Sequence, residues 1–386
     1  MAEIDESNLD LVRESARDLA SRFDLEYWRD KDKRGEYPTE FVKAFADAGW
    51  LGAMIPEEYG GLGLGLTAAS IMLLEAARSG GTAAASAIHF QIFPPGPIIR
   101  HGSEAMKKEF LPQIAAGDIR LAFGVTEPDA GVDTSRITTK ATRIDGGWQI
   151  DGRKVWISNA KHADKIVLLA RTSPRDQEHP FDGLTLFFTD LDRKRITIRE
   201  IEKLGRSAID SNELFIDGLN VRDDEVIGEV GKGFSYLIDG LNPERIVVGF
   251  EQVGLGYAAL DIATHYANER IVFDRPIGKN QAVAHPLADA WIRLEAAQLM
   301  GMKAAQLYDA GEKCGPEANA TKFLGSEAGF LACDRAMQTL GGYSYSKEYH
   351  VERFWRESRL LKIAPVSQEM VLNYLAEHVL GLPRSY

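Results

Sequence analysis

AFGVTEPDAGVD, residues 122–133, is the stretch at which the chain changes from helical to strand periodicity. A strand that ends at Thr126 would present a hydroxyl and backbone groups at its tip, and the Pro and Gly that follow shape a rigid loop. A second stretch, KVWISN at residues 154–159, places the flat face of Trp156 beside a hydroxyl. Taken singly, Trp156 is typical of core packing and Thr126 of a turn. Together the two stretches supply the apolar cover and the hydrogen-bond donors that a flavin ring needs.

The spacing of apolar residues differs between the regions on either side of these stretches and the region that contains them. Apolar residues recur at helical spacing from about residue 7 to 116 and again after residue 231. Between them the period is two, and Gly146-Gly147 between two alternating segments predicts a β-hairpin. Further strands are expected at 166–169, 184–188 and 213–216. A helix rich in small residues, which let neighbouring helices approach closely, is expected at 243–270.

This order of elements predicts an α+β multidomain protein rather than an alternating βαβ fold. The expected domains are an N-terminal helical domain, a middle antiparallel β-domain and a C-terminal helical bundle, at residues 1–120, 121–230 and 231–386.

Charge and composition exclude several classes of function. The formal net charge of −12 argues against a nucleic-acid partner, because phosphate backbones need a basic surface. The acidic N-terminus has no apolar signal region and no run approaches the ~18 apolar residues of a membrane span, so a cytoplasmic protein is expected. The histidines are scattered without a ligand-like cluster, so no metal site is expected. The glycine-rich stretches 60–65 and 228–233 lack the spacing of nucleotide-binding loops.

Five ordered motifs resemble those of the acyl-CoA dehydrogenase family over nearly the whole chain. They are PEEYGGLG at 56–63, VTEPDAGVD at 125–133, KVWISN at 154–159, ERIVFDRPI at 269–277 with Gln281, and QTLGG at 338–342. The resemblance implies the family's three-domain fold, with a barrel-like middle domain and a C-terminal four-helix bundle. It also implies FAD as the cofactor, an acyl-CoA substrate, and an electron-transfer flavoprotein as the acceptor.

The same resemblance implies roles for individual residues. Those expected to contact the flavin ring are Phe123, Val125, Thr126, Trp156, Ile157 and Ser158. Those expected to bind the rest of FAD are Arg270, Phe273, Gln281, Gln338, Gly341, Gly342 and Ser367. In this family the residues around 270 and 340 come from a neighbouring subunit, so a homo-oligomer is implied, usually a dimer of dimers. An arginine also suits a pyrophosphate where no glycine-rich cradle exists.

The catalytic base departs from the commonest family pattern. Most members carry it as a Glu in a C-terminal segment, but an ungapped count places Pro365 there, and proline can neither take a proton nor donate a backbone N–H. A minority, including the isovaleryl-CoA type, carries the base on a preceding helix just before an Arg. Glu244 matches that position. The ordinary alternative is a helix start, with Asn242 as N-cap and Glu244 in a first turn stabilised by the helix dipole.

A base at Glu244 requires burial to raise its pKa by more than the helix dipole lowers it. Asn242 and Arg245 resemble residues that approach the CoA moiety, with support of the helix start as their alternative. Two smaller departures are Val132, where a Ser is usual, and Asp274, where a Gly is usual. Three other functions stay open on the same fold: dehydrogenation of a carrier-protein thioester, a flavin monooxygenase, and a non-catalytic flavoprotein.

Overall fold

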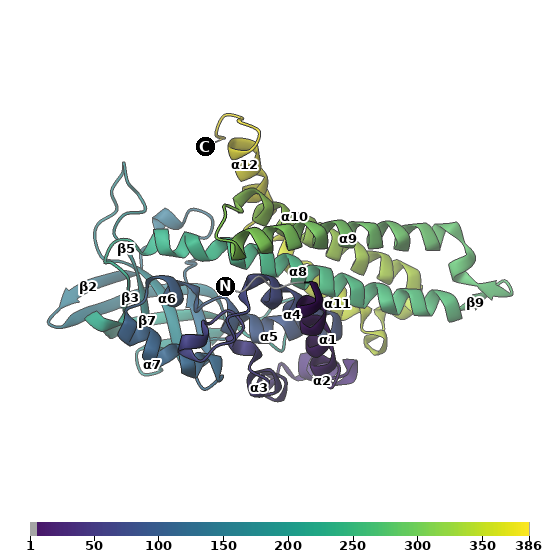
Figure 1. The fold of residues 1–386 in the computed structure, drawn as a ribbon, viewed down its shortest axis with the longest axis horizontal. Coiled ribbons are helices and arrows are strands. Elements are labelled where there is room, and N and C mark those ends of the chain that lie inside the picture. The colour runs from purple at the N-terminus through teal and green to yellow at the C-terminus, as the bar shows by residue number, and fades with distance from the viewer. Residues whose placement is uncertain (1–5, 386) are drawn as a thin grey trace.

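The computed structural model describes residues 6–385 and has a helical part at each end of the chain with a sheet between them in sequence (Figure 1). The N-terminal part contains α1 (Glu6–Ala20), α2 (Leu25–Arg34), α3 (Thr39–Asp47), α4 (Gly65–Gly80), α5 (Thr82–Ile92), α6 (Gly96–His101) and α7 (Glu104–Ala115). Local signals fix several ends. Asp24 accepts a hydrogen bond from the Tyr27 N–H as the N-cap of α2, and Gly35 ends that helix in the left-handed region at φ 62°.

The middle part is one sheet with strand order β6-β7-β3-β2-β4-β5-β8, and β1 pairs with β4. The strands are β1 (Leu121–Gly124), β2 (Lys140–Ile144), β3 (Gly147–Ser158), β4 (Lys165–Arg171), β5 (Leu184–Asp190), β6 (Ile196–Glu200), β7 (Ser211–Arg222) and β8 (Val226–Ile227). The predicted hairpin is present, with Ile144 paired to Gly147. The predicted strands at 166–169, 184–188 and 213–216 are β4, β5 and part of β7.

Two features of the sheet differ from expectation. β1 and β2 both run parallel to β4, so the sheet is mixed rather than antiparallel. The β2–β3 hairpin lies between β1 and β4 in sequence and serves as the crossover that parallel strands require. In addition, β1 ends at Gly124, two residues before Thr126, because the Val125 and Thr126 carbonyls bond to the start of the KVWISN stretch instead of continuing a ladder.

The C-terminal part contains α8 (Gly233–Glu269), α9 (Gln281–Asp309), α10 (Gly315–Leu340), α11 (Val351–Ser358) and α12 (Gln368–His378). A two-stranded hairpin of β9 (Ile271–Val272) and β10 (Arg275–Pro276) joins α8 to α9. The long helices lie side by side (Figure 1). A Cβ on Gly325 would lie 2.6 Å from the Gly249 carbonyl oxygen, so glycine is what lets α10 approach α8 this closely. Single-turn 3-10 helices lie at Trp50–Gly52, Glu57–Tyr59, Thr134–Arg136, Asp223–Glu225, Ile277–Lys279, Gly341–Tyr345, Lys347–Tyr349 and Leu360–Lys362.

The helix expected to begin at Pro243 begins ten residues earlier, at Gly233, and continues through the proline. Pro243 lacks the N–H that would bond to the carbonyl four residues before it, so propensity alone favours a break. Packing overrides it: Phe234 stacks on Phe181 with ring centroids 3.9 Å apart, and Leu237 is buried in the core of the middle part. α8 is long and apolar enough to cross a membrane, but 89% of its apolar 18-residue segment is buried inside the protein, as in the core helix of a globular protein.

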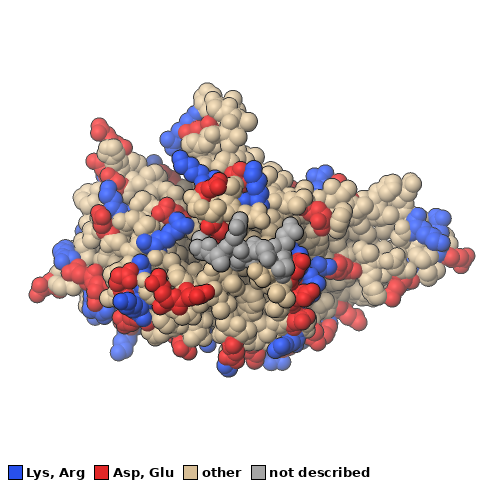
Figure 2. Space-filling view, in the orientation of Figure 1, with Lys and Arg blue, Asp and Glu red and all other residues tan. Residues whose placement is uncertain are grey.

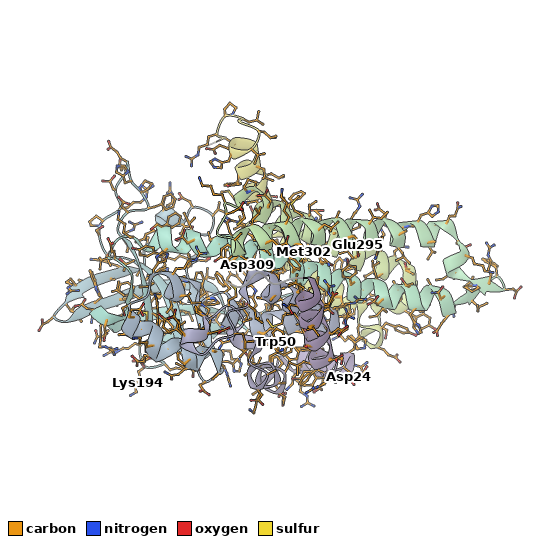
Figure 3. All side chains as sticks on the ribbon, viewed as in Figure 1. Asp24, Trp50, Lys194, Glu295, Met302 and Asp309 are labelled. Atoms are coloured by element: carbon orange, nitrogen blue, oxygen red, sulfur yellow. The ribbon has the colours of Figure 1, made fainter. Side chains whose placement is uncertain are left out.

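The two helical parts share one core. The largest apolar cluster joins residues of α1 to α5 with residues of α8, α9 and α10. Asp309, at the end of α9, accepts hydrogen bonds from the N–H groups of Leu66 (2.7 Å) and Thr67 (2.9 Å) at the start of α4 (Figure 3). A residue of the last domain thus caps a helix of the first. On the face shown in Figure 2, acidic and basic side chains are interspersed without an extended basic area.

Candidate active site

A buried ion pair holds the two predicted flavin stretches together. Lys154 Nζ lies 3.0 Å from Glu127 Oε1 and donates to the Val125 carbonyl at 2.9 Å. The Val155 N–H donates to the Thr126 carbonyl at 2.9 Å. Burial lowers the pKa of Lys154 to about 8. Burial alone would raise the pKa of Glu127, but Lys154 and the Thr139 and Thr138 donors hold it at about 2. The pair is therefore charged at neutral pH, and the two stretches lie side by side.

The backbone at Trp156 turns its indole outward. β3 has a bulge against β7 between Lys154 and Ile157, and Trp156 has φ 62°, which non-glycine residues rarely adopt. The indole is consequently 58% exposed, although it lies within a strand of a buried sheet. A flat aromatic surface is thus held out beside the Thr126 segment, as the flavin prediction requires.

The side chain of Ile157 points into the sheet. It is 2% exposed and belongs to the core of the sheet, because strand alternation turns it away from the side that carries Trp156. Its carbonyl accepts from Asn212 Nδ2 at 2.9 Å. A contact between Ile157 and the flavin would therefore come from its backbone.

Ser158 is backed by a buried arginine that the sequence did not identify. Arg206 Nη2 donates to Ser158 Oγ at 3.3 Å, and its Nη1 donates to Ser86 Oγ on α5 at 2.9 Å. Burial lowers the pKa of Arg206, and its Nε has no hydrogen-bond partner among the described residues. Phe123, from the first flavin stretch, meets Phe93 edge-on at 4.8 Å. Phe123, Val125 and Thr126 are all partly exposed beside these groups.

Glu244 is partly buried in the interior of α8, not in its first turn. The alternative interpretation of this segment as a helix start is therefore wrong. Asn242 is not an N-cap, since its side-chain oxygen accepts from Arg245 Nη1 at 3.0 Å within the helix. Burial raises the pKa of Glu244 to about 7, against the opposing charges of His89 and Arg245. Glu251 adds to the increase. Burial dominates, as a base at this position requires.

Partly buried Arg245, next to Glu244, and a second cation near Arg245 each lack partners for some of their donors. Burial lowers the pKa of Arg245, and its Nε has no hydrogen-bond partner among residues 6–385. Lys322 on α10, which the sequence did not single out, is likewise buried with no partner for Nζ among those residues, and burial lowers its pKa to about 8. The free Arg245 donor suits an anionic or carbonyl ligand group.

The second set of predicted residues, those expected to bind the rest of FAD, lies mainly around the β9–β10 hairpin at one end of the molecule. Arg270 ends α8, and the hairpin tip that follows carries Phe273 and Asp274, both with positive φ as a type I′ turn requires. Phe273 is 93% exposed. The Arg270 guanidinium lies 6.0 Å from the Tyr343 ring centroid, which brings the hairpin close to the Gly341–Tyr345 turn. In Figure 1 the β9 hairpin is at one extremity of the molecule, away from the strands of the sheet.

Within one chain the structure therefore gathers the predicted residues into two separate sets. Gln281 begins α9 next to the hairpin and Gln338 lies in the last turn of α10; both are exposed. A Cβ on Gly341 or Gly342 would meet nothing within 4 Å, which leaves open backbone there. Ser367 belongs to neither element: its hydroxyl caps α12 by accepting from the Met370 N–H at 3.3 Å. The donor sets fit FAD, with an exposed indole and hydroxyls in one place and an arginine, aromatic rings and open backbone in the other.

Comparison with known proteins identifies the chain. Family models for the N-terminal, middle and C-terminal domains of acyl-CoA dehydrogenase match residues 6–118, 122–219 and 231–380. The chain is 37% identical to acyl-CoA dehydrogenase FadE12 of Mycobacterium tuberculosis over 381 residues, covering 97% of this chain and 96% of that protein. It is 33% identical to the caffeyl-CoA reductase-Etf complex subunit CarC of Acetobacterium woodii, covering 94% and 96%.

The fold agrees with a solved relative. A glutaryl-CoA dehydrogenase in complex with glutaryl-CoA superposes with a TM-score of 0.93 at 31% identity, covering 100% of this chain and 98% of that one. The predicted family, fold and cofactor are confirmed. The chain belongs to the acyl-CoA dehydrogenase family of FAD-dependent oxidoreductases.

Proposed function

We propose that this enzyme removes one hydrogen from each of the α and β carbons of an acyl-CoA thioester, giving the 2-enoyl-CoA, with Glu244 as the base. The observation that carries the proposal is a partly buried carboxylate whose pKa burial raises to about 7. A general base works best when its pKa lies near the operating pH. Position 365, where most of the family carries the base, is a proline and cannot serve.

In this mechanism Glu244 takes the α-proton of the bound thioester. Bound FAD would accept the β-hydride. Arg245 lies next to the base on α8 and is held by Asn242, which leaves its Nε free to donate to the CoA moiety. Apolar surroundings that exclude water raise the basicity of the ionised Glu244 carboxylate, because they stabilise its charge less than water does.

We further propose that the ring end of FAD lies against Trp156, Thr126 and Ser158, with Phe123, Val125 and the Ile157 backbone beside it. The bulge at Trp156 supports this placement, because it exposes an aromatic face that would otherwise be buried. Arg206 orients Ser158 from behind through the 3.3 Å hydrogen bond.

The rest of FAD requires the second set, which lies around the β9 hairpin at one extremity of the molecule, whereas Ser158 of the ring site is joined through Arg206 to Ser86 of α5. We propose that a second copy supplies it, so that the enzyme is a homo-oligomer, with a dimer of dimers as the expected state. Exposed apolar side chains on α9 and the hairpin support an interface there: Trp291, Ile292, Leu299, Ile271 and Phe273. The second-copy residues would be Arg270, Phe273, Gln281, Gln338, Gly341 and Gly342.

An electron-transfer flavoprotein is the proposed electron acceptor. The support is the name of the CarC relative, a subunit of a complex that includes Etf. A cytoplasmic location stays a prediction from the sequence.

The proposal is tested by mixing the purified FAD-containing protein anaerobically with a panel of saturated acyl-CoAs and following the loss of flavin absorbance. At least one acyl-CoA should bleach the flavin rapidly. Glu244→Gln should slow the bleaching by ~10²–10⁴-fold, since general-base loss costs that much. Glu14→Gln, an exposed carboxylate on α1, is the matched control and should keep the wild-type rate.

Other outcomes separate the alternatives. Bleaching by a carrier-protein thioester but by no acyl-CoA would move the substrate to the carrier protein. Oxygen consumption that survives Glu244→Gln would favour a monooxygenase. Bound FAD that no acyl thioester bleaches would leave a non-catalytic flavoprotein.

A further inference from the structure

A buried histidine–carboxylate pair lies beside the proposed base and belongs to neither flavin set. His89, on α5, has Nδ1 2.7 Å from Oε1 of Glu251, on α8. The two residues are 5% and 2% exposed. They come from helices far apart in sequence and meet where the N-terminal and C-terminal helices share their core.

The pair is placed to act on Glu244. Glu251 follows Glu244 by seven residues, close to two turns, so both carboxylates project from one face of α8, about 10 Å apart along its axis. The His89 charge lowers the pKa of Glu244, and the Glu244 charge in turn raises the pKa of His89. His89 is thus close enough to both carboxylates of α8 to respond to each.

Aromatic side chains fix the imidazole in this position. The His89 ring meets Phe90 edge-on at 5.3 Å and Phe93 at 5.7 Å. Phe93 then meets Phe123, one of the residues proposed to lie beside the flavin ring. Phe93 therefore links His89 to a residue of the proposed ring site.

The charges that face the pair come from several elements. α8 contributes Glu244, Glu251 and, next to Glu244, Arg245. The segment before β7 contributes Arg206, whose charge opposes protonation of His89. Burial also opposes it, but the Glu251 carboxylate outweighs both and raises the pKa of His89. The contact with Glu251 and the charge of Glu244 both favour the protonated form of the imidazole.

We propose that His89, fixed by its hydrogen bond to Glu251, is a positioning residue that holds a positive charge beside Glu244 and so keeps this base ionised at the pH of catalysis. The inference rests on Glu244 being the base. A buried, hydrogen-bonded cation would offset the loss of hydration that otherwise favours the protonated carboxylic acid.

The charge arrangement predicts that the two single variants and the double variant differ in their effect on the protonation of Glu244. His89→Gln removes the cation and leaves Glu251 as an uncompensated neighbouring anion, so both effects favour protonated Glu244. Glu251→Gln removes the anion but also the partner that keeps His89 charged, so its effects oppose each other. The double variant removes one charge of each sign. Its acid limb should return toward that of the wild type, which a purely structural role of His89 does not predict.

The first experiment measures the pH profile of flavin reduction by an acyl-CoA in the FAD-containing enzyme. The wild-type rate should rise with pH as Glu244 ionises, which gives the profile an acid limb. His89→Gln should move the midpoint of this limb to higher pH by on the order of one unit, which lowers the rate on the acid side about tenfold. His89→Gln/Glu251→Gln should reverse most of this shift. His101→Gln removes another histidine that faces a carboxylate of α8, Asp239 at 3.0 Å, and should leave the limb unmoved.

A second measurement does not depend on turnover. NMR titration of wild-type protein labelled in its eight histidines should show one imidazole with a pKa above about 6.5 that loses this elevated value in Glu251→Gln. A His89 that is neutral throughout would overturn the inference. So would an unmoved acid limb in His89→Gln, or a changed acyl-chain preference with an unmoved limb, which would mean that the pair contacts the acyl group. If instead Glu244→Gln reduces flavin at the wild-type rate, the proposed function fails first.

Discussion

Lys154 and Glu127 are joined by a buried ion pair, 3.0 Å from Nζ to Oε1, which ties the bulged end of β3 to the loop after β1. The same lysine donates to the Val125 carbonyl, so one side chain aligns both segments that are proposed to hold the flavin ring. Thr138 and Thr139 donate further hydrogen bonds to Glu127. The proposed ring site is thus held by buried contacts between the sheet and the loop after β1.

Removal of this lysine should destabilise the protein and weaken FAD binding together. Lys154→Met leaves Glu127 buried without its cation, which typically costs about 3–5 kcal/mol. Thermal unfolding and the flavin content after purification measure the two effects. Lys165→Met removes a partly exposed pair with Asp190 and should cost less than about 1 kcal/mol. Equal losses in the two variants would contradict the alignment role of Lys154.

The stability of the protein should depend on pH through Glu244. Its pKa rises from 4.5 to about 7 on folding, so between these values the folded protein binds more protons than the unfolded chain. The free energy of unfolding therefore falls as pH rises through this window, by up to roughly 3 kcal/mol, and stays lower above it. Glu244→Gln should raise the unfolding midpoint at about pH 8 but not below about pH 4. A pH-independent difference between the two proteins would contradict this.

The cap that Asp309 provides should matter more than an ordinary N-cap. Asp309→Ala leaves the Leu66 and Thr67 N–H groups of α4 without their acceptor and also breaks a contact between two domains. Asp24→Ala removes only the cap within α2 (Figure 3). Loss of a cap typically lowers the free energy of unfolding by about 0.5–2 kcal/mol. The loss for Asp309→Ala should lie at or above the upper end of this range, and the loss for Asp24→Ala near its middle. Denaturant unfolding of the two variants compares them directly.

Sharing of FAD between copies can be tested by complementation. Trp156→Ala should disable the ring end of the site and Arg270→Gln the distal end, so neither variant should be active alone. Co-expression should restore activity in mixed oligomers, because some sites then combine an intact ring end with an intact distal end from the other chain. Phe273→Ser should lower flavin retention without changing unfolding of the chain itself, since that side chain is 93% exposed. Absence of activity in the mixtures would mean that each site is built from one chain.

Much of the site could be predicted because its motifs are short and local. The hairpin at 146–147 is present, and the 125–133 and 154–159 stretches lie side by side, as the sequence pattern indicated. The start of α8 was missed because packing of Phe234 and Leu237 outweighs the helix-breaking tendency of Pro243.

Residues that depend on long-range contacts were not predictable in the same way. Arg206 reaches Ser158 and Ser86 from a loop with no motif of its own, and His89 meets Glu251 across 162 positions of sequence. A weak signal did exist, since Glu251 is a charged residue inside the apolar stretch of α8. The outward turn of Trp156 needed the bulge against β7, which alternation alone does not show.

Proton abstraction by Glu244 can be measured apart from hydride transfer. The FAD-containing enzyme is incubated anaerobically in D₂O with an acyl-CoA that binds but is not oxidised, and exchange of its α-protons is followed by NMR. Wild type and Glu14→Gln should exchange the α-protons, and Glu244→Gln should slow the exchange by ~10²-fold or more. Exchange at the wild-type rate in Glu244→Gln would show that another group is the base.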